Sequence, residues 1–195
     1  MNRISNSDKR IWEIRWHGRG GQGAVTSAQI LAEAAYYDGY QGVTSAPYFG
    51  AERRGAPVTA TTRFSPETIR VYSEVETPDV VVVLDESLLK DDDVTSGLNQ
   101  GGWLIVNSTR RPAEIRLGGG FSVATANATG IAQELGLVVA GVYVVNTPIL
   151  GAFLRATGLL SLESVCQAIK GKFSAADADR NFRAVELAFE STLLK

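Results

Sequence analysis

Residues 79–84 (DVVVVL) constrain the fold more than any other segment of the chain. The segment holds four consecutive valines and a leucine, follows Pro78, and is followed directly by Asp85 and Glu86. β-branched residues favour strands, and a short strand that is apolar at successive positions is typical of a parallel sheet covered on both faces. Residues 102–107 (GWLIVN) repeat the pattern. The two segments therefore predict an α/β protein with a buried, mostly parallel sheet.

The remaining segments alternate between strand and helix patterns. Residues 24–37 place apolar side chains at helical spacing, whereas residues 58–64 are rich in threonine and other strand-forming residues. We expect residues 70–73 to pair with 58–64 as a hairpin. Strands are predicted at 11–17, 58–64, 79–84, 102–107 and 121–126, with a short segment at 41–46, and helices at 24–37, 128–135, 146–158, 161–173 and 175–194.

Length and composition indicate one globular domain. The chain has 195 residues, of which 45% are hydrophobic and 21% charged, and these values are close to the globular average. No linker, internal repeat or low-complexity tract divides the sequence. We therefore predict a single Rossmann-like domain over residues 1–195, with a polar N-terminal extension at 1–10, helices on both faces of the sheet and a helical C-terminus.

The charges argue against nucleic-acid binding and restrict where an anion would bind. The formal net charge is −2, so no global positive field attracts a polyanion. Residues 71–100 hold one basic and eight acidic residues, whereas 1–70 hold nine and six, and 101–195 hold nine and seven. An anion site is therefore expected in the first or the last of these blocks.

Cys166 and His17 are the single cysteine and the single histidine of the chain. One cysteine excludes an intramolecular disulfide and an iron–sulfur cluster ligated by this chain alone. We expect Cys166 to pack as a small apolar residue in a helix and His17 to be a hydrogen-bonded residue at a strand end. The longest apolar stretches, 80–84 and 137–145, are shorter than the roughly 18 residues of a membrane span, and the N-terminus lacks an apolar signal segment. A cytoplasmic protein without membrane contact is expected.

The segment GRGGQG lies between the predicted strand 11–17 and the predicted helix 24–37, and it matches the pattern G-x-G-x-x-G. In that context glycines allow a sharp turn and a close approach of backbone N–H groups to a phosphate, which the helix dipole also attracts. A turn that binds no ligand is the simpler alternative. The residues of the loop are Gly18, Arg19, Gly20, Gly21, Gln22 and Gly23.

A nicotinamide-binding domain would also need an acidic residue near the end of its second strand, to hold the ribose hydroxyls. Residues 39–46 contain none, and the next acid, Glu52, is flanked by Arg53 and Arg54. The loop thus favours a phosphate ligand other than NAD, and an NAD(P)-dependent dehydrogenase remains an alternative based on the glycine motif alone. Asp85 and Glu86 follow a buried strand, where a helix cap is expected and a contact with substrate or partner is the alternative.

The segments WHGRGGQGAVTSAQILAEAAYYDG and PYFGAERRGAPVTATTR resemble the gamma subunit of 2-oxoacid:ferredoxin oxidoreductases, and most closely the pyruvate type. The resemblance continues through VVVLDESLL, GGWLIVNS and NTPILGAF, so it covers about residues 10–190. Relatives that act on branched-chain or aromatic 2-oxoacids stay open. The resemblance implies a subunit that is inactive alone and helps to bind coenzyme A (CoA). Alpha, beta and delta partner subunits would hold thiamine diphosphate, Mg and the iron–sulfur clusters, and ferredoxin would accept the electrons.

The resemblance also suggests which residues contact CoA or an adjoining chain. The second glycine- and arginine-rich block could be a CoA contact or an interface loop, because an arginine fork suits phosphate and carboxylate alike. The start of the predicted helix 146–158 offers further N–H groups to an anion. A structural adaptor without a ligand is the remaining alternative. The implied residues are Gly18, Arg19, Gly20, Gly21, Gln22, Gly23, Glu52, Arg53, Arg54, Asn146 and Thr147.

Overall fold

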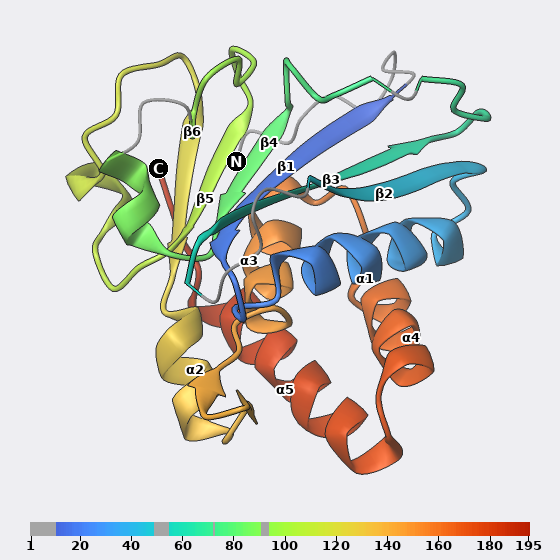
Figure 1. Cartoon of the computed structure of the whole chain (residues 1–195), viewed down its shortest axis with the longest axis vertical. Coiled ribbons are helices and arrows are strands. Elements are labelled where there is room, and N and C mark those ends of the chain that lie inside the picture. Colours follow the sequence, from blue (N-terminus) through green and yellow to red (C-terminus); the bar gives the residue numbers. More distant parts are fainter. Residues whose placement is uncertain (1–10, 49–54, 72, 91–93) are drawn as a thin grey trace.

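The computed structural model describes residues 11–48, 55–71, 73–90 and 94–195 and contains a twisted seven-stranded sheet (Figure 1). The strand order is β2-β3-β1-β4-β5-β6-β9, and a separate hairpin is formed by β7 and β8. The strands are β1 (Trp12–Arg19), β2 (Gly42–Tyr48), β3 (Pro57–Ser65), β4 (Val80–Val83), β5 (Trp103–Asn107), β6 (Ser122–Ala126), β7 (Val138–Val139), β8 (Val142–Tyr143) and β9 (Leu193–Leu194). The helices are α1 (Ala24–Tyr37), α2 (Ala128–Glu134), α3 (Pro148–Thr157), α4 (Leu162–Lys172) and α5 (Ala175–Ser191), with short 3-10 helices η1 (Glu86–Lys90) and η2 (Pro112–Glu114).

The centre of the sheet is parallel, as the sequence predicts. Strands β1, β4, β5 and β6 pair in parallel, with Trp16 opposite Val82 and Val82 opposite Ile105. β3 runs antiparallel to β1, and β2 runs antiparallel to β3, so β2 points the same way as β1. Five of the seven strands therefore share one direction, and β3 and β9 run against it.

The predicted hairpin at residues 70–73 is wrong. β3 has β1 on one side and β2 on the other, so it has no free edge for a third strand. Residues 70, 71 and 73 lie outside the strands. The segment that pairs with β3 is instead Gly42–Tyr48, which precedes β3 along the chain.

The five α-helices lie together on one face of the sheet, below it in Figure 1. Their main apolar core surrounds the indole of Trp16, which is fully buried and stacks on Phe153 of α3 with ring centroids 6.3 Å apart. Its ring N–H donates to the Thr62 hydroxyl (3.0 Å), which donates in turn to the Ala28 carbonyl (2.9 Å). This chain of bonds fixes α1 against β1 and β3, and it leaves the buried indole N–H satisfied.

The opposite face is covered by the 3-10 helices and loops. Val81, Val83 and Leu104 pack there against Leu88 of η1 and against Ile115, which follows η2. Helical elements thus cover both faces, although the longer ones share one face. Strands β4 and β5 are buried on both sides, which is the physical reason for the continuous apolar runs in their sequences.

The contact between α3 and α5 is unusually close. A Cβ at Gly151 would overlap the carbonyl oxygen of Val185, so glycine lets the two backbones approach. The Thr147 hydroxyl donates to the Asn181 side-chain oxygen (2.8 Å) and joins the start of α3 to α5. The predicted helix 175–194 ends earlier, at Ser191, because Leu193 and Leu194 pair with β6 as strand β9.

A candidate ligand groove at the glycine loop

The glycine loop connects β1 to α1 and leaves the N-terminus of the helix open. Gly23 is the N-cap residue with φ 89° and ψ 25°, a left-handed conformation that glycine adopts without strain. It provides no side-chain cap, and the first turn holds no acidic residue. The N–H groups of the first turn of α1 are therefore free of a capping side chain, and they make this end of the helix attractive to an anion.

Asn146 lies directly against the loop. A Cβ at Gly23 would lie only 2.7 Å from the Cβ of Asn146. Ser27 of α1 donates from its hydroxyl to the carbonyl oxygens of Asn146 (2.9 Å) and Gly23 (3.1 Å). The structure thus brings the glycine loop and the NTPILGAF segment together, although Asn146 lies 123 positions after Gly23.

Arg19 turns its guanidinium toward the protein. Its Nε forms an ion pair with Asp85 Oδ2 (3.2 Å), Nη1 donates to the Gly55 carbonyl (3.1 Å), and Nη2 donates to the Ser87 hydroxyl (2.8 Å). The guanidinium that the sequence offers to a phosphate is already paired with Asp85, so the observed role of Arg19 is to hold the loop. The part of the loop left for a ligand is chiefly its backbone.

Gln22 and Asp85 also hold the loop. We call the bonded group of Arg19, Gln22 and Asp85 the Asp85 clamp. The Gln22 side chain accepts a hydrogen bond from the Arg19 backbone N–H (2.8 Å) and donates to Asp85 Oδ2 (3.1 Å). Asp85 also accepts from the Ser87 N–H (3.0 Å), which confirms its expected role as a cap at the start of η1. Burial alone would raise the pKa of Asp85, but hydrogen bonds from Ser87 and Gln22 and the charge of Arg19 outweigh it and lower that pKa below 3.8. Asp85 therefore carries a negative charge at neutral pH.

The segment GAERRGAP (residues 50–57) contacts the glycine loop through Gly55 and Ala56. The Gly20 N–H donates to the Ala56 carbonyl (2.9 Å), and the Gly55 N–H donates back to the Gly20 carbonyl (3.3 Å). These two bonds tie the segment before β3 to the glycine loop. Glu52, Arg53 and Arg54, which the sequence also singles out, lie outside the described residues.

A groove of about 760 Å³ opens beside the loop. The glycine loop and the first turn of α1 form one wall, and the β7–β8 hairpin forms a second, apolar wall. The end of α4 contributes Lys172, whose ammonium group donates to Gln29 (2.9 Å), and Phe173 follows it. None of the described residues that line the groove is Asp, Glu, His or Cys. The lining residues are Arg19, Gly20, Gly21, Gly23, Ala24, Val25, Thr26, Val58, Val139, Ala140, Val142, Val144, Asn146, Lys172 and Phe173.

The remaining residues singled out by the sequence lie apart from this groove. Thr147 is fully buried and bonds to Asn181, so it fixes α3 where Asn146 faces the groove. His17 is hydrogen-bonded as expected, since its Nε2 accepts from Arg15 Nε (3.0 Å). Burial, with a smaller effect of the Arg15 charge, lowers the pKa of His17 to about 4, so it is neutral at pH 7. Cys166 is half-buried in α4.

Sequence reasoning missed Lys172, Phe173 and the hairpin as parts of the site. Lys172 and Phe173 come from the end of a helix that is remote in sequence from the loop, and no motif marks them. The apolar stretch 137–145 was the available signal for the hairpin. Among the described residues, no group of three or more His, Cys, Asp or Glu side chains could hold a metal ion, and no helix is long and apolar enough to cross a membrane.

Comparison with known proteins identifies the family. The family model for pyruvate ferredoxin/flavodoxin oxidoreductase matches residues 13–191. The chain belongs to this family. One relative is the protein named pyruvate/ketoisovalerate oxidoreductases common subunit gamma, from Thermococcus kodakarensis. It is 50% identical to this chain over 187 residues, and the match covers 93% of this chain and 97% of the relative.

Solved structures of oxidoreductase proteins share the fold. The crystal structure of pyruvate oxidoreductase subunit PORC from Thermotoga maritima superposes with a TM-score of 0.83 at 37% identity, covering 96% of this chain and 99% of that one. The 2-oxoglutarate:ferredoxin oxidoreductase from Magnetococcus marinus, solved with 2-oxoglutarate, coenzyme A and succinyl-CoA bound, gives a TM-score of 0.73 at 20% identity. The match covers 94% of this chain but only 31% of the Magnetococcus chain. At 20% identity it shows a shared fold alone.

Proposed function

We propose that this chain is the gamma subunit of a 2-oxoacid:ferredoxin oxidoreductase and that the groove beside its glycine loop helps to bind CoA. In this proposal, alpha, beta and delta subunits hold thiamine diphosphate, Mg and the iron–sulfur clusters. The complete enzyme converts pyruvate, or a related 2-oxoacid, and CoA to acyl-CoA and CO₂, and the electrons pass to ferredoxin. The single cysteine of this chain suits a subunit that holds no cluster of its own.

The observation that carries the proposal is the composition of the groove. CoA combines anionic phosphates with a long, mostly uncharged pantetheine arm. The open N-terminus of α1 and the ammonium group of Lys172 suit the phosphates, and the valines of the hairpin suit the arm. The amide of Asn146 lines the same groove and suits the peptide-like groups of the arm.

The residues of the groove suit binding rather than bond-breaking chemistry. The described lining residues include no carboxylate, imidazole or thiol that could act as a general base or a nucleophile. The part played by this chain is then to hold CoA and to direct its thiol toward chemistry on a partner subunit. Pre-organisation of the loop by the Asp85 clamp lowers the entropy lost when CoA binds.

The Michaelis constant for CoA in the assembled enzyme tests the proposal. Lys172→Met removes the charge but keeps most of the unbranched side chain, and we expect KM for CoA to rise about tenfold, the value of one charge-assisted hydrogen bond. The turnover number should change little, because Lys172 contacts no reacting atom in this proposal. Lys170→Met is the matched control, since Lys170 is exposed on the same helix and does not line the groove.

Two outcomes would reject CoA binding at this groove. An equal KM for CoA in the Lys172→Met and Lys170→Met enzymes would favour the structural adaptor. Saturable binding of NADH, with none of CoA, would favour the NAD(P)-dependent dehydrogenase. Isolation of the native protein together with iron and thiamine diphosphate tests the assembly separately from the CoA site.

A further inference from the structure

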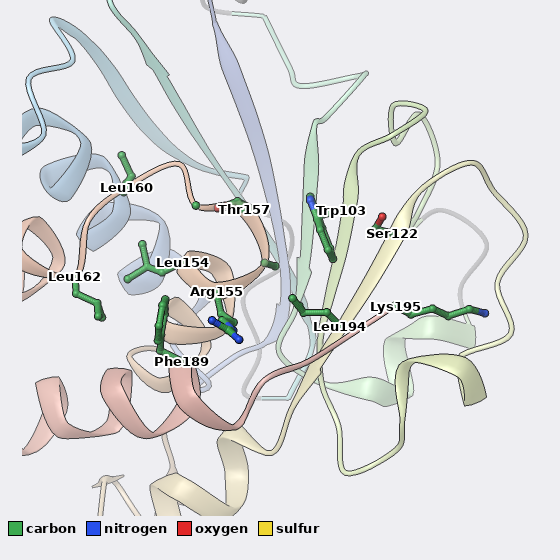
Figure 2. A pocket seen from close by; sticks show the side chains of 12 residues that line it. Trp103, Ser122, Leu154, Arg155, Thr157, Leu160, Leu162, Phe189, Leu194 and Lys195 are labelled. Carbon is green, nitrogen blue, oxygen red and sulfur yellow. The ribbon is translucent and has the colours of Figure 1, made fainter. Parts of the chain in front are cut away.

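A second cavity, of about 680 Å³, lies between the C-terminal end of α3, the end of α5 and the first residues of β5 and β6 (Figure 2). Among the described residues, it shares no lining residue with the groove at the glycine loop. Its walls are mostly apolar and include Trp103, Leu154 and Phe189. We call it the Arg155 cavity after the arginine that lines it. Its lining residues are Trp103, Ser122, Leu154, Arg155, Ala156, Thr157, Gly158, Leu160, Leu162, Phe189, Leu194 and Lys195.

Arg155 is held in the cavity without a polar partner for its buried nitrogen. Its guanidinium carbon lies 5.5 Å from the centroid of the Phe189 ring, a cation–π contact that orients the planar group. The Nε atom is buried and has no hydrogen-bond partner. A buried donor without a partner costs roughly 1–3 kcal/mol. None of the described residues that line the cavity is Asp or Glu, so the missing acceptor is not supplied by the lining.

The rim of the cavity is an exposed apolar edge of the sheet. β9 forms the edge of the sheet beside β6, and Leu194 lines the cavity. Leu193 and Leu194 are 48% and 38% exposed. An arginine beside an aromatic ring, with an exposed leucine at the rim, has the composition of the centre of a protein–protein interface rather than of free surface.

We propose that the Arg155 cavity receives an Asp or Glu side chain of a partner subunit, with Leu194 packing against apolar residues around that carboxylate. This inference rests on the proposed function, because it takes the partner from the same oxidoreductase complex. A carboxylate can accept from the buried Nε and from a terminal nitrogen of Arg155 together. The pairing supplies the acceptor that the isolated chain lacks.

The charge of the cavity favours one carboxylate over a phosphate ligand. Figure 2 shows the Lys195 side chain turned away from Arg155, so among the described residues that line the cavity a single cation faces it. A phosphate group carries up to two charges and is usually held by several donors, whereas one guanidinium matches one carboxylate. The exposed side chain of Leu194 extends the apolar surface at the rim of the cavity, and this suits a protein surface better than a small free acid.

Reassembly of the complex tests the proposal. Gamma chains with Arg155→Gln or Arg155→Lys, and Arg180→Gln as the control, are added to the remaining subunits, and dissociation constants are measured by interferometry. Arg180 lies on the exposed face of α5 and pairs with Asp177 of its own helix. We expect Arg155→Gln to raise the dissociation constant at least tenfold, Arg155→Lys to raise it less, and Arg180→Gln to leave it unchanged.

Two further measurements separate docking from folding and from a free ligand. The unfolding midpoint of the isolated Arg155→Gln chain should be unchanged or higher, since the substitution removes a buried Nε–H that has no acceptor. A photo-crosslinking benzoylphenylalanine in place of Leu194 should link, in the purified complex, to a partner peptide that contains Asp or Glu.

The outcomes distinguish this inference from the proposed function. If the wild-type chain does not assemble with the other subunits, both are wrong. If it assembles and Arg155→Gln binds as tightly as Arg180→Gln, the docking inference alone is overturned, whatever the KM for CoA. Crosslinks confined to this chain, with propionate raising the unfolding midpoint of the wild type but not of Arg155→Gln, would also overturn it in favour of a free carboxylate.

Discussion

Gly23 offers a direct test of how closely the glycine loop approaches Asn146. Alanine at position 23 must adopt a φ of 89°, which costs about 1–2 kcal/mol for a residue with a Cβ. Its Cβ would also lie 2.7 Å from the Cβ of Asn146 and 3.2 Å from a methyl group of Val144. Relief of such overlap in a packed site costs about 1–3 kcal/mol more. We therefore expect Gly23→Ala to lower the free energy of unfolding by about 2–5 kcal/mol.

Gly21 provides the matched control. Its φ of 97° is also left-handed, but a Cβ there would meet no atom within 4 Å. Gly21→Ala should therefore lose only the backbone contribution, about 1–2 kcal/mol. Urea unfolding of the full chain measures both values, and the difference between them isolates the steric cost.

A double-mutant cycle identifies the neighbour responsible. Asn146→Gly removes the Cβ that Gly23→Ala would meet, so the two substitutions together should cost less than the sum of their separate effects, by about 1 kcal/mol or more. Equal destabilisation by Gly21→Ala and Gly23→Ala, or strict additivity in the cycle, would refute the close approach of the two motifs.

Three further substitutions test other features of the fold. The pKa of His17 is lowered from 6.5 to about 4, so as the pH falls the unfolded chain protonates this imidazole before the folded chain does. The free energy of unfolding therefore declines between pH 6.5 and pH 4. His17→Gln should make that decline shallower, as measured by urea midpoints at pH 7 and pH 5. The pKa of Asp85 is lowered, so the stability that its carboxylate contributes is present above pH 3.8 and is lost as the pH falls through the pKa of the folded state. Asp85→Asn should lower the free energy of unfolding at pH 7 by about 1–2 kcal/mol and raise KM for CoA. An unchanged KM would mean that the Asp85 clamp does not shape the groove. Thr125 is buried with no partner for its hydroxyl, so Thr125→Val should be neutral or should stabilise by up to about 1 kcal/mol in thermal unfolding, and a clear loss of stability would reveal a bond to this hydroxyl.

Local sequence signals predicted the elements that depend on local chemistry. Helix α1 begins after Gly23 and ends at Tyr37 as predicted, because glycines flank a regular apolar spacing. β4 and β5 follow from continuous apolar runs that require burial on both faces. The errors concern pairing between distant segments. Strand β9 has only two residues and exists because β6 offers it an edge, which no local pattern encodes.

In the candidate site, too, local motifs could be predicted from the sequence and contacts between distant segments could not. The glycine motif located the loop and the start of α1, and the segment NTPILGAF located Asn146. The sequence did not indicate that Arg19 would be paired with Asp85, because a charge in a loop gives no sign of whether it points to solvent or to the protein. Lys172 enters the groove through the packing of α4 on α1, which becomes visible only in the folded chain.

The bond between Thr147 and Asn181 makes the geometry of the groove depend on α5, a helix that contributes no described lining residue. Asn146 precedes Thr147, so its place in the groove depends on where α5 holds the start of α3. Under the proposed function, selection for ligand binding acts on both ends of this bond. Among members of the family, positions 147 and 181 should have changed together, either as a donor with its acceptor or as an apolar pair, and the inherited unit of the site is therefore larger than the set of residues that a ligand contacts.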